Sequence, residues 1–205
     1  MPQKIIIVRH GETNYNIERR LQGWMDIPLN KEGLKQADKV AERLKEVLVT
    51  SIYTSDLKRA NSTAKKISKK LGIKPSMRHE LREDNLGVLE GWKWEVEVDV
   101  VKERLWKERD DTVISGDLHW RGHGGDSRHT HTQRVKKFLD EIEEKHPKGS
   151  IIIVSHGGTI NRIMEIYGLK DPKSEYINYG NTSVTILEKS GSGYKIELDN
   201  DTSHL

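Results

Sequence analysis

The sequence predicts an α/β protein with three layers, in which helices flank a mostly parallel central sheet. Two short runs of β-branched residues, 5–8 and 151–154, have the continuous apolar character of strands that are buried on both faces. Segments with the helical spacing of apolar residues lie between these two runs. Buried strands that alternate with helices form mostly parallel sheets, so these observations set the fold class.

Two helices are expected between the first strand and the middle of the chain. The first follows Asn30, whose side chain suits the N-cap position. Its expected buried face consists of Leu34, Ala37, Ala41, Leu44 and Leu48. The second helix is expected to start at a cap formed by Asp56 or Ser55 and to end at Gly72. Its expected buried face consists of Leu57, Ala60, Ala64, Ile67 and Leu71.

The second half of the chain predicts two more helices and a closing pair of strands. Val135, Phe138, Leu139 and Ile142 mark a helix that ends before Pro147, and residues 159–167 form a shorter one. Two apolar stretches, 184–187 and 194–198, flank the turn residues 190–193 and predict a strand pair.

The length of 205 residues predicts one domain that spans residues 1–205. Between about residue 92 and residue 132 the periodic pattern weakens. We interpret this segment as an insertion, part helix and part loop, that forms a cap over the functional site. Its tryptophans lie among charged residues and are Trp92, Trp94, Trp106 and Trp120.

The composition narrows the class of partner. Lys and Arg number 35 and Asp and Glu 32, mixed along the chain, which gives a net charge of +3. This balance suits a small anionic substrate and lacks the basic stripe of a nucleic-acid-binding protein. The chain has no cysteine, which excludes disulfides and thiolate metal sites. The apolar run near the N-terminus is too short for a signal segment or a membrane span, so we expect a cytoplasmic protein that binds no membrane. A homodimer is compatible with the sequence.

Each apolar run is followed by a histidine and a glycine. The first run leads into Arg9-His10-Gly11, and the second leads into Ser155-His156-Gly157. Open α/β sheets bind ligands beyond the carboxyl ends of their strands, so both histidines are expected at that edge. The glycine permits the tight turn and the close backbone approach that a tetrahedral oxyanion needs.

The residues around these histidines fit a phosphate monoester. Transfer of a phosphoryl group requires positioning and stabilisation of the charge on its oxygens. Arg9 supplies a planar fork of donors, and Arg59 is expected in the first turn of the second helix, where backbone N–H groups also favour anions. His156 precedes another helix and, when protonated, would add a third positive charge.

Two chemical roles remain to be assigned among these residues. A neutral imidazole with one free ring nitrogen can accept the phosphoryl group, and we choose His10 because of its neighbours, although His156 could exchange roles with it. A carboxyl group must protonate the leaving oxygen and later deprotonate water. Glu83 is the leading candidate, and Asp84 and Glu90 are alternatives that sequence spacing does not separate.

The order of these motifs resembles the histidine phosphatase superfamily, the phosphoglycerate mutase-like group. The matching segments run in family order from about residue 5 to residue 187, with a gap at the insertion. They are Arg9-His10-Gly11-Glu12-Thr13 with Asn16, Leu21-Gln22-Gly23, Asp26 with Pro28 and Leu29, Ser55-Asp56-Leu57 with Arg59 and Ala60, Leu81-Arg82-Glu83, and Ser155-His156-Gly157-Gly158-Thr159.

The resemblance implies a phosphohistidine at His10 and makes Glu83 the proton donor and then the base. It implies no metal and no other cofactor. The implied catalytic residues are His10, Glu83, His156, Arg9 and Arg59. The implied phosphate-binding residues are Arg9, Asn16, Gln22, Gly23, Arg59, His156 and Gly157. Asn181 looks like part of the family segment before the last core strand and fits a structural role as well as a substrate-facing one.

Within this family the sequence looks like the phosphatase branch. Cofactor-dependent mutases typically carry His-Gly-Asn-Ser where this chain has His156-Gly157-Gly158-Thr159, and they have a longer insertion. We therefore expect a phosphatase that hydrolyses phosphate monoesters of small molecules. The alternatives are a 2,3-bisphosphoglycerate-dependent phosphoglycerate mutase and a non-catalytic, phosphate-binding regulatory module.

Four histidines gather near the end of the insertion, within thirteen positions. Their spacing fits no standard pattern of metal ligands, so we expect a polar loop rather than a metal site. Together with Asp126 and Ser127 they are candidates for shaping substrate choice. The four are His119, His123, His129 and His131.

Overall fold

Six strands form the central sheet of the protein in a computed structural model that describes residues 1–93 and 96–205. The strands are β1 (Lys4–Arg9), β2 (Ser51–Ser55), β3 (Pro75–Arg78), β4 (Ser150–Ser155), β5 (Val184–Ser190) and β6 (Gly193–Asp201). Their order across the sheet is β3-β2-β4-β1-β5-β6. The pairs β3–β2, β2–β4 and β4–β1 are parallel, whereas β5 is antiparallel to both of its neighbours. The predicted mostly parallel sheet is confirmed.

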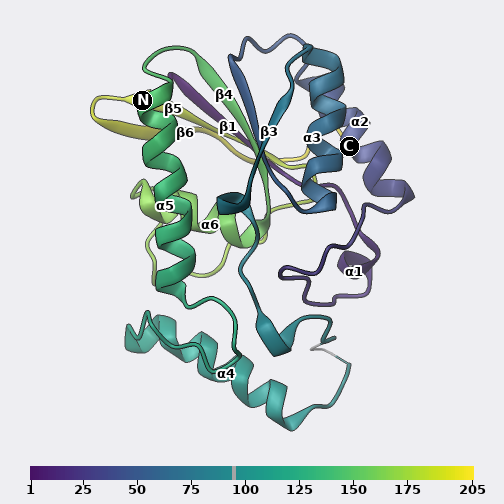
Figure 1. The fold of residues 1–205 in the computed structure, drawn as a ribbon, viewed down its shortest axis with the longest axis vertical. Coiled ribbons are helices and arrows are strands. Elements are labelled where there is room, and N and C mark those ends of the chain that lie inside the picture. Colours follow the sequence, from purple (N-terminus) through teal and green to yellow (C-terminus); the bar gives the residue numbers. More distant parts are fainter. Residues whose placement is uncertain (94–95) are drawn as a thin grey trace.

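The helices are α1 (Asn14–Ile17), α2 (Lys31–Arg43), α3 (Lys58–Leu71), α4 (Val100–Ser115), α5 (Arg128–Lys145) and α6 (Gly157–Ile166), with two short 3-10 helices, η1 (His79–Leu81) and η2 (Gly87–Leu89). Successive side chains of β1 point to opposite faces of the sheet. Ile6 and Val8 pack with residues of α2 and α3, whereas Ile5 and Ile7 pack with residues of α5 and α6. Figure 1 shows these two pairs of helices on opposite sides of the sheet. The three-layer arrangement is confirmed.

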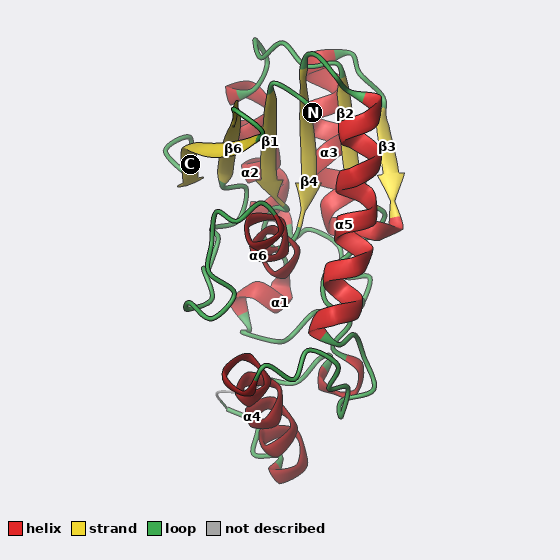
Figure 2. Cartoon of the chain, turned by 90° about the vertical axis from the view of Figure 1, so that its left-hand side faces the viewer, coloured by secondary structure: helices red, strands yellow, loops and turns green. Residues whose placement is uncertain are grey.

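The two strands predicted from apolar runs are direct neighbours. β1 and β4 pair in parallel, and the last pair in their register is Arg9 with Ser155. His10 and His156 therefore leave the sheet side by side. In Figure 2 the arrows of these strands point toward the end of the molecule at which α4 lies. The carboxyl edge of the sheet and α4 thus face each other across the region that contains both histidines.

The prediction for α2 is right about its start and partly wrong about its buried face. The Asn30 side chain accepts the N–H of Gly33 at 2.7 Å, as an N-cap should. Leu34, however, is 40 % exposed, and Leu48 is 91 % exposed. The helix ends at Arg43 and the chain then turns, so Leu48 no longer continues the helical spacing.

The prediction for α3 is right about its end and wrong about its cap. Gly72 ends the helix with a φ of +69°, a conformation that favours glycine. At the other end the N-cap position belongs to Leu57. Asp26, from a loop far away in the sequence, accepts the N–H of Lys58 at 2.7 Å. The expected cap Asp56 instead forms two 2.7 Å bonds with the guanidinium of Arg82.

The later elements agree with the sequence, and two strands were missed. α5, α6 and the β5–β6 pair lie where they were predicted. β2 and β3 were not predicted, because neither contains a run of apolar residues or a regular alternation. β2 is nevertheless buried between β3 and β4, and its polar Thr54 is fully buried.

The predicted insertion contains α4, followed by a loop that leads into α5. Leu105 of α4 packs on Leu86, Leu89 and Trp92, with Trp106 and Trp120 at the border of this small core. Trp94 lies outside the described residues. The predicted boundary of 132 falls inside α5, which begins at Arg128. Within the part of the chain that the structure describes, no helix has both the length and the apolar character needed to cross a membrane.

Candidate active site

The two histidines that follow β1 and β4 face each other at the carboxyl edge of the sheet. Their ring centroids are 5.1 Å apart, and the side chains of His10 and His156 are 2 % and 0 % exposed. The backbone of His10 is held on two sides, because its N–H donates to the carbonyl of Ser155 and its own carbonyl accepts the N–H of Thr182. The predicted meeting of the two histidines is therefore observed.

The ring of His10 has the form that a nucleophile requires. Its Nδ1 lies 2.7 Å from the carbonyl oxygen of Gly11. A carbonyl only accepts hydrogen bonds, so Nδ1 carries the proton and Nε2 keeps a free lone pair. Burial, together with the cations of Arg59 and Arg9, lowers the pKa of His10 well below its ordinary value. The imidazole is therefore neutral near pH 7.

His156 is also neutral, but in the opposite tautomer. The Nε–H of Arg59 donates to Nδ1 of His156 at 3.2 Å, so the proton of the neutral ring lies on Nε2. Burial and the neighbouring Arg59 lower the pKa of His156 well below its ordinary value. Nε2 is buried and has no partner among the described residues. The structure thus presents His156 as a neutral hydrogen-bond donor rather than as the third cation that the sequence suggested.

Two buried arginines supply the positive charge of the pocket. Arg59 donates to the carbonyls of Met25 and Gly23 at 2.7 and 2.8 Å, which holds its guanidinium beside His156. Burial lowers the pKa of Arg59 to about 10, so it remains cationic at neutral pH. Arg9 donates through Nη1 to the carbonyl of Tyr179, and its Nε is buried without a partner in the described structure. Donors without a partner beside a buried histidine fit an anion.

Of the three candidate carboxylates, Glu83 lies at this pocket. Its Oε2 accepts the N–H of Gly158 at 3.1 Å, one residue beyond the start of α6. Asp84 is instead paired with Arg109 of α4. Glu90 accepts the N–H groups of Trp24 and Leu86 and so ties two loops together. The geometry therefore distinguishes residues that sequence spacing left equivalent.

The chain segment that carries Glu83 is held by side chains at four consecutive carbonyls. Arg134 donates to the carbonyls of Glu80, Arg82 and Glu83 at 2.9–3.1 Å. Trp24 donates its indole N–H to the carbonyl of Glu83 at 2.7 Å. The remaining carbonyl, of Leu81, accepts the hydroxyl of Ser155. These bonds fix the backbone from which the Glu83 carboxylate reaches α6.

A known protein family matches the chain that builds this pocket. The model of the histidine phosphatase superfamily (branch 1) matches residues 5–202. This chain belongs to the histidine phosphatase superfamily. The match covers all the residues that line the pocket, so the facing histidines, the two arginines and Glu83 are parts of a histidine phosphatase fold.

Individual relatives in the superfamily carry both mutase and phosphatase names. Phosphoglycerate mutase-like protein 4 of Arabidopsis thaliana is 37 % identical over 98 % of this chain and 86 % of its own. Probable phosphoglycerate mutase GpmB of Escherichia coli is 34 % identical over 98 % of this chain and 94 % of its own. The structure of a mycobacterial glucosyl-3-phosphoglycerate phosphatase with VO3 is similar with a TM-score of 0.82 at 27 % identity, covering 98 % of this chain and all of that one. These likenesses support a phosphatase or mutase-like enzyme.

The other predicted phosphate-binding residues of this histidine phosphatase surround the loop after β1. Asn16 caps α1 reciprocally with Thr13, and the Thr13 hydroxyl lies 3.1 Å from the side-chain oxygen of Gln22. Gly23 has a φ of +49° and places its carbonyl on Arg59. Asn181 donates to the carbonyl of His10 at 3.1 Å, which assigns it a structural contact behind the histidine.

Gly157 and Gly158 begin α6 next to the pocket, and each leaves room for a side chain from another segment. A Cβ on Gly157 would lie 2.9 Å from the hydroxyl of Tyr176. A Cβ on Gly158 would lie 2.3 Å from Oε1 of Glu83. The two glycines thus permit close approach on either side of the helix start.

The four histidines of the histidine-rich stretch do not gather at one site. His131 is buried in α5 and bonds to Thr159 at 3.1 Å, whereas His123 accepts the N–H of Gly125. His119 and His129 stack with ring centroids 4.4 Å apart. Among the described residues, no three histidine, aspartate or glutamate side chains are placed to hold a metal ion.

Asp126 and Ser127, which the sequence made candidates for shaping substrate choice, form structural contacts. Asp126 pairs with Arg134 at 2.8 Å and accepts the N–H of Asn85. Ser127 caps α5 through the N–H of Thr130. These contacts favour other residues, which reach the pocket itself, as the determinants of substrate choice.

Sequence reasoning missed Trp24 and Tyr176. Trp24 donates a hydrogen bond to the carbonyl of Glu83, and the guanidinium groups of Arg82 and Arg134 lie 4.9 and 5.6 Å from its ring centroid. Trp24 lies between Gly23 and Asp26, inside the segment that resembles the family, and this position could have marked it as a residue of the site. Tyr176 belongs to a stretch of loop in which no motif was recognised.

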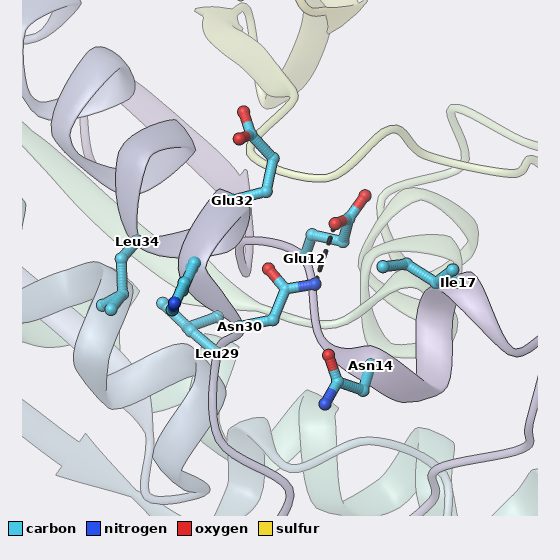
Figure 3. Close-up of a pocket in the computed structure, with 8 residues that line it drawn as sticks. Glu12, Asn14, Ile17, Leu29, Asn30, Glu32 and Leu34 are labelled. Carbon is cyan, nitrogen blue, oxygen red and sulfur yellow. Dashed lines mark hydrogen bonds between the residues drawn. The ribbon is translucent and has the colours of Figure 1, made fainter.

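A separate surface hollow lies beyond the loop that follows His10. Figure 3 shows its lining, with Ile17 and the Asn30 amide on either side of Glu12 and a bond of 2.9 Å between Asn30 and Glu12. Leu29 and the exposed Leu34 add apolar surface. None of the five predicted catalytic residues belongs to its lining. This hollow is therefore distinct from the charged pocket.

Proposed function

We propose that this protein is a metal-independent phosphatase that hydrolyses phosphate monoesters of small molecules through a phosphohistidine at His10. The observation that carries the proposal is the pair of buried histidines in opposite tautomers. His10 presents a free ring nitrogen, and His156 presents an N–H without a partner in the described structure. One is suited to attack phosphorus and the other to bind a phosphoryl oxygen.

The first step forms a bond between Nε2 of His10 and phosphorus while the bond from phosphorus to the ester oxygen breaks. Arg9, Arg59 and the Nε2–H of His156 stabilise the charge on the three non-bridging oxygens. Glu83, in its protonated form, gives its proton to the departing ester oxygen, and the alcohol leaves. The products are the free alcohol, a phosphorylated His10 and the Glu83 carboxylate.

The second step returns the enzyme to its starting form. A water molecule attacks phosphorus, the bond from phosphorus to His10 breaks, and Glu83 takes up a proton from the water. Inorganic phosphate leaves, and His10 is again a neutral ring with its Nδ1–H on the carbonyl of Gly11. The positive charge in both steps comes from arginine side chains of the chain itself.

The test is hydrolysis of p-nitrophenyl phosphate in excess EDTA, together with rapid acid-free trapping of the phosphoenzyme. We expect turnover with EDTA and a phosphoryl group that is labile in acid and stable in alkali, as phosphohistidine is. His10→Ala should lose both. Full activity of His10→Ala, or a requirement for added metal, would contradict the proposal.

A matched control is available at a histidine far from the pocket. His146 follows α5 and bonds to the hydroxyl of Tyr53 at 2.7 Å, at the opposite edge of the sheet from His10. His146→Ala should keep its turnover and its phosphoenzyme. A loss in this variant equal to that of His10→Ala would show that the assay reports folding rather than the nucleophile.

A phosphoglycerate mutase is the second candidate, supported by the names of the relatives from Escherichia coli and Arabidopsis thaliana. The two activities differ in the fate of the phosphoryl group. Incubation with 3-phosphoglycerate and catalytic 2,3-bisphosphoglycerate distinguishes them. Formation of 2-phosphoglycerate faster than inorganic phosphate would establish the mutase. Phosphate binding without either product would establish the third reading, a non-catalytic regulatory module.

A further inference from the structure

Tyr176 reaches the charged pocket from the segment that joins α6 to β5. The residue is 59 % exposed, but its hydroxyl lies toward the start of α6. The position that a Cβ on Gly157 would occupy lies 2.9 Å from the Tyr176 hydroxyl and 3.9 Å from Nε of Arg9. The phenol therefore lies over the start of α6, close to the arginine Nε that has no partner among the described residues.

Charged side chains from two sides act on the Tyr176 hydroxyl. Arg9 and Glu83 act on it from the sheet side, and Arg109 acts on it from α4. Burial of the hydroxyl and the Glu83 carboxylate raise the pKa of Tyr176 above its ordinary value. The hydroxyl stays protonated at neutral pH, so it can donate a hydrogen bond.

The direction in which an alcohol must leave follows from the same contacts. Arg59 and the two histidines lie on the inner side of the pocket, at the edge of the sheet. The ester oxygen must face Glu83 to receive its proton, and Glu83 lies beside the start of α6. The alcohol half of a bound ester therefore extends outward, past Gly157, toward Tyr176 and α4.

We propose that Tyr176 binds the leaving group: its hydroxyl donates a hydrogen bond to an oxygen on the alcohol half of the substrate, and its ring covers that half from solvent. The inference rests on the proposed function for the direction of departure. It names a substrate class, phosphate monoesters whose alcohol carries an oxygen that accepts a hydrogen bond. Gly157 leaves room for the Tyr176 hydroxyl, because the Cβ of any larger residue would displace it.

The kinetic test compares Tyr176→Phe on glycerol 2-phosphate, which has such acceptors, and on phenyl phosphate, which has none. Loss of one donor should lower kcat/KM on glycerol 2-phosphate about tenfold, and the loss on phenyl phosphate should be several times smaller. Gly157→Ala should change the ratio of the kcat/KM values for the two substrates in the same direction. Equal losses on both esters, or no loss on either, would overturn the inference.

Tyr167→Phe is the matched control. Tyr167 packs against Tyr194 in the core, with ring centroids 4.7 Å apart, and its hydroxyl is buried away from the pocket. The same chemical change there should leave the ratio of the two substrates unaltered. If Tyr167→Phe changed this ratio of kcat/KM values as much as Tyr176→Phe does, the ratio would not report on the Tyr176 hydroxyl.

A binding measurement separates this inference from the hydrolysis itself. In the His10→Ala background the ester stays intact, so calorimetry gives its dissociation constant whether or not the protein hydrolyses it. Adding Tyr176→Phe should weaken binding of glycerol 2-phosphate about tenfold and that of phenyl phosphate several times less. Equal binding before and after the change would overturn the role of Tyr176. A wild-type protein that binds selectively without hydrolysis would instead overturn the proposed function.

Discussion

At the scale of single residues, Gly158 is the position where one added carbon should affect catalysis more than folding. Its Cβ would lie 2.3 Å from Oε1 of Glu83. Gly158 stands in the first turn of α6, where alanine is favoured by about 1 kcal/mol over glycine in helix propensity. We therefore expect Gly158→Ala to lower kcat at least tenfold while the melting temperature changes little.

Gly193→Ala provides the control for this prediction. Gly193 begins β6, and in the described structure nothing lies within 4 Å of the place its Cβ would take. This variant should keep the wild-type kcat on p-nitrophenyl phosphate. An unchanged kcat in Gly158→Ala would mean that the Glu83 carboxylate does not act from the position it has here.

The same scale shows where sequence reasoning stops. His10 and His156 could be placed because each follows a strand whose register is set by its apolar residues. Glu83 could not be separated from Asp84 and Glu90 by physical argument, because this stretch has no period that assigns a side chain to one direction. Tyr176 was out of reach for the same reason, since a contact across an irregular loop leaves no local pattern.

At the scale of elements, Arg134 of α5 joins a helix to the segment that carries Glu83. It donates to three carbonyls of that segment and to the carboxylate of Asp126. Arg134→Ala removes all four bonds and leaves the carbonyl of Glu80 without its donor, which should cost about 2–3 kcal/mol of unfolding free energy. Because the Glu83 backbone loosens, kcat should fall more than KM rises.

Two variants on the same helix make this prediction specific. Lys136→Ala removes an exposed pair with Asp140 and should change stability by less than about 0.5 kcal/mol. Arg134→Lys keeps the charge and part of the bonding, so it should recover some of the lost kcat. Denaturant unfolding and steady-state kinetics measure both effects. A destabilised Arg134→Ala with the wild-type kcat would show that Glu83 does not depend on this clamp.

The elements themselves were predictable where the signal is local. The helices α2, α3, α5 and α6 follow from apolar spacing, and Gly72 ends α3 as expected. β2 was missed because its strand character comes from its place between two other strands rather than from its residues. The cap of α3 was misassigned because Asp26 reaches it through the tertiary fold.

At the scale of the whole molecule, the fold concentrates positive charge at one edge of the sheet. The net charge of +3 is small, and many charged side chains form pairs on the surface. Arg9 and Arg59 are instead buried beside two neutral histidines. Composition predicts an anionic partner only in general, whereas the shared carboxyl edge of the parallel strands β3, β2, β4 and β1 gives that charge a definite site.

The stability of the whole chain should depend on pH through its buried histidines. Burial lowers the pKa values of His10, His156 and His131 well below the ordinary range, and His131 also faces several arginines. The neutral His131 ring donates from Nε2 to Thr159, whose own hydroxyl donates to the carbonyl of Arg82. Asp84, 3.8 Å from Nδ1 of His131, is already paired with Arg109 and does not reverse the effect.

The sign of this dependence follows from proton binding. The unfolded chain binds protons at these histidines as the pH falls through about 6.5, whereas the folded chain does not, so the folded state loses stability on acidification. The loss between pH 7.5 and pH 5.5 should be about 1.4 kcal/mol for each buried histidine. His131→Gln, which removes one of these groups, should reduce the decrease in unfolding free energy by the share of one histidine, about 1.4 kcal/mol. Denaturant unfolding at pH 7.5 and pH 5.5 measures this decrease in unfolding free energy. A wild-type protein that is equally stable at both pH values would show that these histidines titrate in the folded state.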